Sequence, residues 1–184
     1  MALKDSRGVL YSTHSRPALD RFEAALDRAN SYFGDPFEPV DEALGHDPEF
    51  AMGHCLKAGV MCMATEKALE PAIRENLERA EALWSTANDR ERGHMAAVRA
   101  WLDGDFTRAV ELYGDVALAY PHDLLAVQFA HLGDFYLGQS QMLRDRVPRV
   151  LPHWDESRPG YGYVLGMHAF GLEETNLYRR AEET

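Results

Sequence analysis

The segment from Gly104 to Pro121 constrains the fold of this chain more than any other stretch. Its spacing is G-x-F-x2-A-x3-Y-x2-V-x4-P, carried by Gly104, Phe106, Ala109, Tyr113, Val116 and Pro121. Glycine adopts the positive φ of a tight turn at little cost, and proline ends a helix. The apolar residues between them recur every three or four positions and therefore share one helix face. The pattern predicts the second helix of a helix-turn-helix unit, in which small Ala109 lets two antiparallel helices approach closely.

This order and spacing is typical of the second half of a tetratricopeptide repeat, a unit of about 34 residues. The same register returns at Gly138, 34 residues after Gly104. We therefore expect clear repeats at residues 90–123 and 124–157. Pro148 lies inside the second helix of the later repeat and is expected to bend or break it. Asn176 stands where a third copy of the pattern would have its turn glycine.

Capping residues predict further helices. Ser15 and Pro17 are typical of a helix start, and Pro71 and Asn88 open later helices. An apolar helix is expected over Phe50 to Ala64, and a short one over Val40 to Leu44. The alternating run at residues 8–12 is isolated and short, so no strand is expected.

The prediction is an all-α chain, a tetratricopeptide-like right-handed α-solenoid of antiparallel helix pairs. Residues 1–184 would form a single domain of about four to five pairs. The chain stops at Thr184 without the polar-faced helix that usually caps a solenoid. We therefore expect it to be the N-terminal part of a longer solenoid.

Composition limits the classes of partner. The net charge is −11, whereas nucleic acids and anionic membrane surfaces attract basic proteins. No apolar run reaches the roughly 18 residues of a membrane span, and the N-terminus does not resemble a signal peptide. We expect a cytoplasmic protein with no nucleic-acid or membrane partner. Cys55 and Cys62 lie two turns apart on one predicted helix, too far for a disulfide, and are expected to be reduced and buried.

Several longer segments resemble the tetratricopeptide repeat protein 38 family. The resemblance spans most of the chain and is carried by residues 47–54, 88–94, 120–123, 129–131 and 160–174. It implies a superhelical repeat fold, a cytoplasmic location and a considerably longer protein. It implies no reaction, and no catalytic residue is carried over from it.

Four histidines fall on successive predicted first helices, at 54, 94, 131 and 168, spaced 40, 37 and 37 residues apart. First helices line the concave surface of a solenoid, so these side chains could form a ladder along a ligand groove. Hydrogen-bonded core histidines are the alternative, and His131 in particular holds a position that normally faces the partner helix. Repeat spacing of roughly 10 Å is too wide for one zinc ion. We expect no metal site and no cofactor.

Two classes of function remain open. The first is a protein- or peptide-binding scaffold, whose candidate groove residues are His94, Arg99, His131, Asp134 and His168. The second is a small-molecule enzyme on the same scaffold, hydrolase-like, in which His168 and Glu173 or Glu174 act as acid and base and His131 orients the substrate. A third use is structural, with an exposed end that docks missing C-terminal repeats or a second copy.

Aromatic residues at helical spacing are mostly expected in the core. They include Trp84, Trp101, Phe106, Tyr113, Phe129, Phe135 and Tyr136. Trp154 lies in a Pro- and Gly-rich segment, residues 151–162, and is the aromatic residue least expected to be buried.

Overall fold

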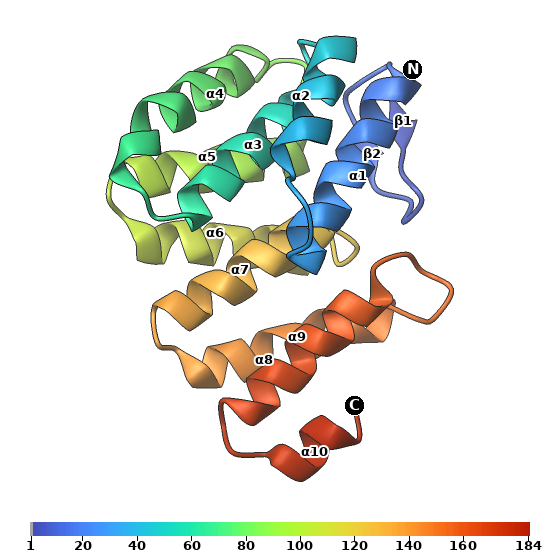
Figure 1. Ribbon diagram of the computed structural model, residues 1–184, viewed down its shortest axis with the longest axis vertical. Coiled ribbons are helices and arrows are strands. Elements are labelled where there is room, and N and C mark those ends of the chain that lie inside the picture. The colour runs from blue at the N-terminus through green and yellow to red at the C-terminus, as the bar shows by residue number, and fades with distance from the viewer. Residues whose placement is uncertain (1) are drawn as a thin grey trace.

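The computed structural model describes residues 2–184, and this part of the chain is all-helical apart from one small hairpin (Figure 1). The helices are α1 (Arg16–Ser31), α2 (Phe37–His46), α3 (Ala51–Met63), α4 (Glu70–Ala82), α5 (Asp89–Leu102), α6 (Phe106–Ala119), α7 (Leu124–Tyr136), α8 (Ser140–Val150), α9 (Tyr161–Glu173) and α10 (Tyr178–Glu182). Two single 3-10 turns, η1 (Lys67–Leu69) and η2 (Leu151–His153), precede α4 and follow α8.

Neighbouring helices pack as pairs, and successive pairs stack along the long axis of the molecule (Figure 1). The helix pairs predicted for residues 90–123 and 124–157 are present as α5 with α6 and α7 with α8. None of the helices in the described part of the chain combines the length and apolar character that crossing a membrane requires.

The local signals read from the sequence form as predicted. The Ser15 side chain accepts a hydrogen bond from the backbone of Ala18, and Asn88 forms a reciprocal capping box with Glu91. The turn residues Gly104 and Gly138 have φ values of 85° and 68°. Asn176, which replaces the turn glycine in the third copy of the pattern, also has a positive φ, 61°.

Two local predictions were wrong. Leu3–Lys4 (β1) pairs antiparallel with Leu10–Tyr11 (β2), so the run at residues 8–12 does contribute a strand. The helix expected at Val40–Leu44 is longer at both ends, since proline is tolerated in its first turn at Pro39. Helix α8 is not broken at Pro148: it continues through this residue and ends two residues later, at Val150.

Tyr113, Phe22 and Phe50 are the largest fully buried side chains of an apolar core that runs through the stacked pairs. Cys55 and Cys62 are buried free thiols, as predicted. Trp154, the aromatic residue whose burial was least expected, is also buried, and its indole N–H donates to the Pro121 carbonyl at 2.8 Å.

The N-terminal part of the chain contacts α9 and the loop before it on one side of the molecule. Arg158, in the loop before α9, donates to the backbone oxygen of Arg7 at 2.7 Å. The hydroxyl of Tyr163 on α9 donates a hydrogen bond to the Asp27 carboxylate on α1, also at 2.7 Å. These two hydrogen bonds join residues that are 151 and 136 positions apart in the sequence. The segments that they connect border a space between α1, α7 and α9.

Candidate functional site

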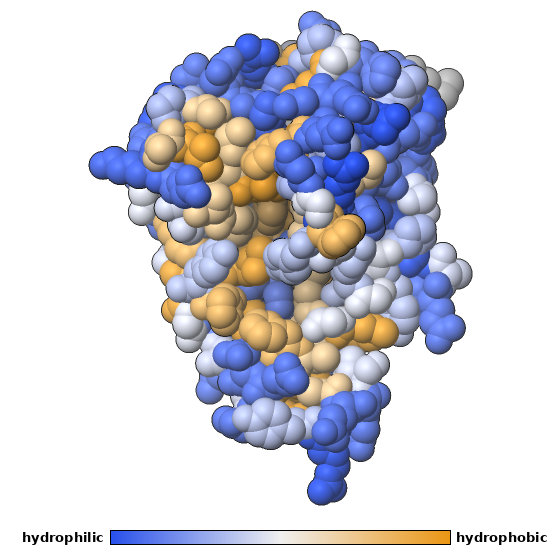
Figure 2. Space-filling model, viewed as in Figure 1, coloured by the Kyte–Doolittle hydropathy of each residue, from blue (hydrophilic) through white to orange (hydrophobic). Residues whose placement is uncertain are grey.

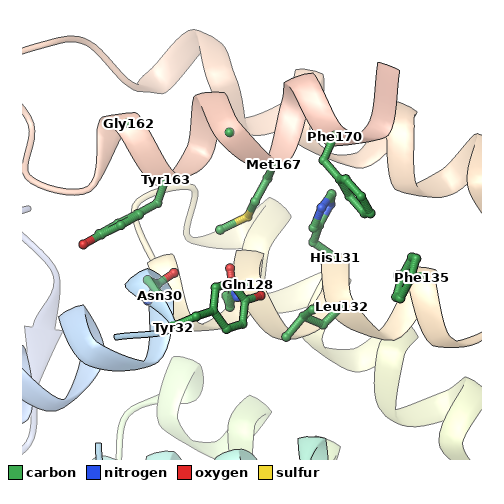
Figure 3. Close-up of a pocket in the computed structure, with 11 residues that line it drawn as sticks. Asn30, Tyr32, Gln128, His131, Leu132, Phe135, Gly162, Tyr163, Met167 and Phe170 are labelled. Carbon is green, nitrogen blue, oxygen red and sulfur yellow. The ribbon is translucent and has the colours of Figure 1, made fainter. Parts of the chain in front are cut away.

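A cleft of about 370 Å³ lies where the C-terminal end of α1 faces α7 and α9 (Figure 3). Its size falls in the range of small-molecule and side-chain pockets. It is lined by Asn30, Tyr32, Gln128, His131, Leu132, Phe135, Gly162, Tyr163, Gly166, Met167 and Phe170. Most of these side chains are apolar or aromatic, so the cleft is suited to apolar groups with a few polar contacts.

The end of α1 supplies a tyrosine that crosses the mouth of the cleft. Tyr32 is the C-cap of α1 in the left-handed conformation, with φ of 53°. The side chain is 72 % exposed, yet its hydroxyl accepts a hydrogen bond of 2.6 Å from the Gln128 amide on α7. A left-handed turn is unfavourable for a tyrosine, and it directs the chain from α1 back toward α7. The amide hydrogen bond holds Tyr32 beside Gln128 in the lining of the cleft (Figure 3).

Helices α7 and α9 form the opposite walls. His131 packs edge-on against Phe170, with ring centroids 5.9 Å apart, and Phe170 contacts Phe135 at 5.5 Å. Gly162 and Gly166 leave the facing side of α9 open, because a Cβ added to either would meet no atom within 4 Å. The glycines therefore provide room for a ligand, and the aromatic cluster provides contact surface.

Burial keeps the histidine of the cleft uncharged. The ring of His131 is only 4 % exposed, and its Nδ1 has no hydrogen-bond partner in residues 2–184. Desolvation, reinforced by the charge of Arg146, lowers the pKa of His131 to about 4. Neutral pH thus leaves the imidazole with one donor nitrogen and one acceptor nitrogen.

A second hollow of about 240 Å³ adjoins the cleft. It shares Tyr32, Gln128 and Leu132 with the cleft and extends toward the ends of α1 and α3. Figure 2 shows apolar side chains gathered in the hollowed middle of this face. The two hollows together form a groove along α7, with Tyr32 between them.

Most of the groove residues predicted from the sequence lie elsewhere. His94 is buried and its Nε2 contacts the Asp123 carboxylate at 2.7 Å. Asp134 is fully buried and accepts two hydrogen bonds from Arg146, at 2.6 and 2.9 Å. Arg99 is half-buried in an ion pair with Glu81. Burial of His94 and Asp134 is incompatible with a ligand-facing position, because both point into the packing between helices. Among the five candidates only His131 lines the cleft.

The proposed acid-base group is not assembled. His168 is half-buried, and its Nδ1 has no hydrogen-bond partner in the described chain. Glu173 and Glu174 are exposed, and neither is bonded to that nitrogen. Desolvation and nearby Arg180 lower the pKa of His168. The geometry required for an enzyme that uses these three residues is therefore missing.

The four histidines do not form a ladder along the cleft, because His131 alone among them lines it in the described residues. His54 contacts Asn76 and the Pro48 carbonyl at 3.2 and 3.0 Å, and it is buried like His94 and His131. Residues 2–184 contain no group of three or more His, Cys, Asp or Glu side chains that could hold a metal ion.

Sequence reasoning missed Asn30, Tyr32, Gln128 and Met167 as site residues. Asn30 and Tyr32 are nearly 100 residues from α7, with a separation of 96 between Tyr32 and Gln128, and no local pattern links them. A signal did exist on α9, where Gly162 and Gly166 are spaced by four and therefore share a helix face.

No protein-family model matches the chain, and no solved structure matches it significantly. The geometry of the cleft therefore carries the functional argument.

Proposed function

We propose that this chain is a binding scaffold of the tetratricopeptide type, a right-handed α-solenoid whose groove takes a protein or peptide segment. The observation that carries the proposal is the apolar cleft between α1, α7 and α9. Two of its walls, α7 and α9, are first helices of successive pairs, as in the concave face of such solenoids. Binding modules of this kind recognise an extended or helical segment through a few anchored side chains.

The shape of the groove supports a peptide over a single small molecule. The cleft and the adjoining hollow, about 370 and 240 Å³, are separate depressions on one face and share α7 as their common wall. Two depressions along one helix suit two anchor side chains of a single segment. Half-exposed Phe135 and Tyr136 extend the apolar surface along the same helix. Apolar and aromatic anchors that fill pockets supply most of the affinity at such interfaces.

The net negative charge of the chain favours a basic partner. The chain carries 30 acidic and 19 basic residues, and charge complementarity accelerates the encounter of partners. Two buried, reduced thiols fit a cytoplasmic location, where disulfides are rare.

The test is a selection of peptides of about a dozen residues on the wild-type protein, followed by titration of the winners. Gly166→Leu places a side chain in the cleft; a Cβ at position 166 would meet no atom within 4 Å, so we expect the fold to tolerate the change. We expect this variant to weaken binding at least tenfold. Gly45→Leu, on α2 at a position with equally open surroundings, is the matched control and should bind as the wild type does. Equal affinity of all three proteins would contradict the proposal, as would a failure to select any peptide.

A further inference from the structure

The polar groups of the cleft gather at one end. In Figure 3, Asn30, Tyr32 and Tyr163 lie together on one side with Gln128 beside them, whereas Phe135 and Phe170 lie on the other. The Tyr163 hydroxyl donates to the carboxylate of exposed Asp27 at 2.7 Å, so a negative charge lies next to this end, although Asp27 does not itself line the cleft. The cleft thus has a polar end and an apolar end.

The polar end presents hydrogen-bond acceptors. Asn30 is 5 % exposed, and its Nδ2 donates to the Leu26 carbonyl at 2.8 Å, which fixes the orientation of the amide. Its Oδ1 has no partner in residues 2–184. Gln128 is oriented in the same way, since its Nε2 donates to Tyr32, and its Oε1 remains an acceptor. A buried acceptor without a partner is unusual in proteins and is satisfied when a donor binds.

Cations of the surrounding chain are engaged elsewhere. Arg146, behind His131, is held in its buried pair with Asp134. Arg28, which lines the adjoining hollow, donates to the Asp35 carbonyl and to Glu38. His131 itself is neutral at pH 7 because burial lowers its pKa. An anionic ligand would therefore meet the acceptor oxygens of Asn30 and Gln128 and would be repelled by the Asp27 carboxylate behind Tyr163.

The remaining walls suit a donor that carries positive charge. The rings of Tyr32 and Tyr163 flank the polar end (Figure 3). Aromatic faces attract ammonium and guanidinium groups through the negative potential above the ring. Leu132, Phe135 and Phe170 at the other end offer contact to an alkyl or aromatic body.

We propose that the cleft binds an organic cation, an ammonium or guanidinium head on an apolar body, with the head against Asn30 and Gln128 and attracted by the Asp27 carboxylate behind Tyr163. The body lies against Leu132, Phe135 and Phe170. This inference rests on the proposed function and names its ligand chemistry: the anchor is a lysine or arginine side chain beside an apolar residue of the bound segment. A free organic amine shares the same chemistry, and the experiment separates the two sources.

Three probes with one carbon skeleton test the charge preference: phenylpropylamine, phenylpropanol and phenylpropionate. Binding is followed by the methyl resonance of Met167, which lines the cleft, with fully buried Met95 on α5 as the internal reference. We expect the amine to shift the Met167 signal and to bind at least tenfold more tightly than the carboxylate, with the alcohol between them. Equal or tighter binding of the carboxylate, or no shift with the amine at millimolar concentration, would overturn the inference.

Two variants assign the preference to named groups. Asn30→Leu replaces the amide by a similarly branched apolar side chain, removes the unpartnered acceptor, and should reduce the ratio of amine to alcohol affinity severalfold. Asp27→Asn retains an acceptor for the Tyr163 hydroxyl but removes the charge, so it should lower amine affinity and leave alcohol affinity unchanged. Asp115→Asn, at an exposed position on α6, removes the same charge away from the cleft and is the control. A ratio unchanged in both cleft variants would refute the assignment, since a purely structural effect would weaken all three probes alike.

A peptide arm separates this inference from the proposed function. In a selected peptide, replacement of a lysine or arginine by norleucine should cost at least tenfold in affinity. If phenylpropylamine binds at Met167 while no peptide is selected, the cation site stands and the peptide function fails. If peptides bind and tolerate the norleucine replacement, the peptide function stands and the cation site is refuted.

Discussion

Two glycines of α9 should respond to the same substitution with opposite signs. A Cβ added at Gly166 would meet no atom within 4 Å, because this side of the helix faces the cleft. At Gly171 the added Cβ would lie 2.7 Å from the Arg144 Cα and 2.7 Å from the Leu143 carbonyl oxygen on α8. These are backbone atoms, which cannot move aside without shifting the whole helix.

The magnitudes follow from helix propensity and packing. Alanine in a helix interior is more favourable than glycine by about 0.5–1 kcal/mol. Gly166→Ala should therefore stabilise the protein by about that amount. At Gly171 the same gain is outweighed by overpacking, which typically costs about 1–3 kcal/mol. We expect a net loss of about 1–2 kcal/mol for Gly171→Ala, so that the two variants differ by about 2 kcal/mol.

Urea unfolding followed by circular dichroism measures the difference directly. The midpoint should rise for Gly166→Ala and fall for Gly171→Ala at an unchanged slope. In a thermal scan, about 1 kcal/mol corresponds to roughly 2–4 °C for a chain of this size. Shifts of the same sign for both variants would show that the packing of α9 against α8, or the openness of the cleft, differs from that described above.

Three further predictions concern buried polar groups. Asp134→Ala should lower the unfolding free energy, measured in urea, by about 3–5 kcal/mol, because it leaves the Arg146 guanidinium buried without its partner. The double variant Asp134→Leu with Arg146→Met should recover most of that loss. An equal loss in the single and the double variant would contradict the reasoning. The pKa of His131 is about 4, below the ~6.5 of an unfolded histidine. The folded protein therefore loses about 3 kcal/mol of unfolding free energy as the pH falls from ~6.5 to 4. His131→Leu should flatten the plot of stability against pH in this range, and parallel plots for variant and wild type would refute the prediction. Burial raises the pKa of the Cys62 thiol to about 12 and that of Cys55 also, so both should react with a thiol reagent only in denaturant, whereas rapid labelling of the native protein would contradict their burial.

The sequence alone determined the helices, because their signals are local. The turn glycines Gly104 and Gly138, the caps at Ser15 and Asn88 and the three-to-four spacing of apolar residues each act within a few positions. The tetratricopeptide and family assignments stay predictions, as does the expectation that the chain belongs to a longer solenoid.

Only the tertiary structure decided which side chains meet. His94 and Asp134 stand at helix positions compatible with a groove, but Asp123 and Arg146 draw them into buried hydrogen bonds. The cleft joins Asn30 and Tyr32 to Gln128 and Tyr163, residues brought together by the path of the whole stack. Helical periodicity fixes the face on which a side chain lies but not the direction in which successive pairs turn, and that direction sets the cleft between α1, α7 and α9.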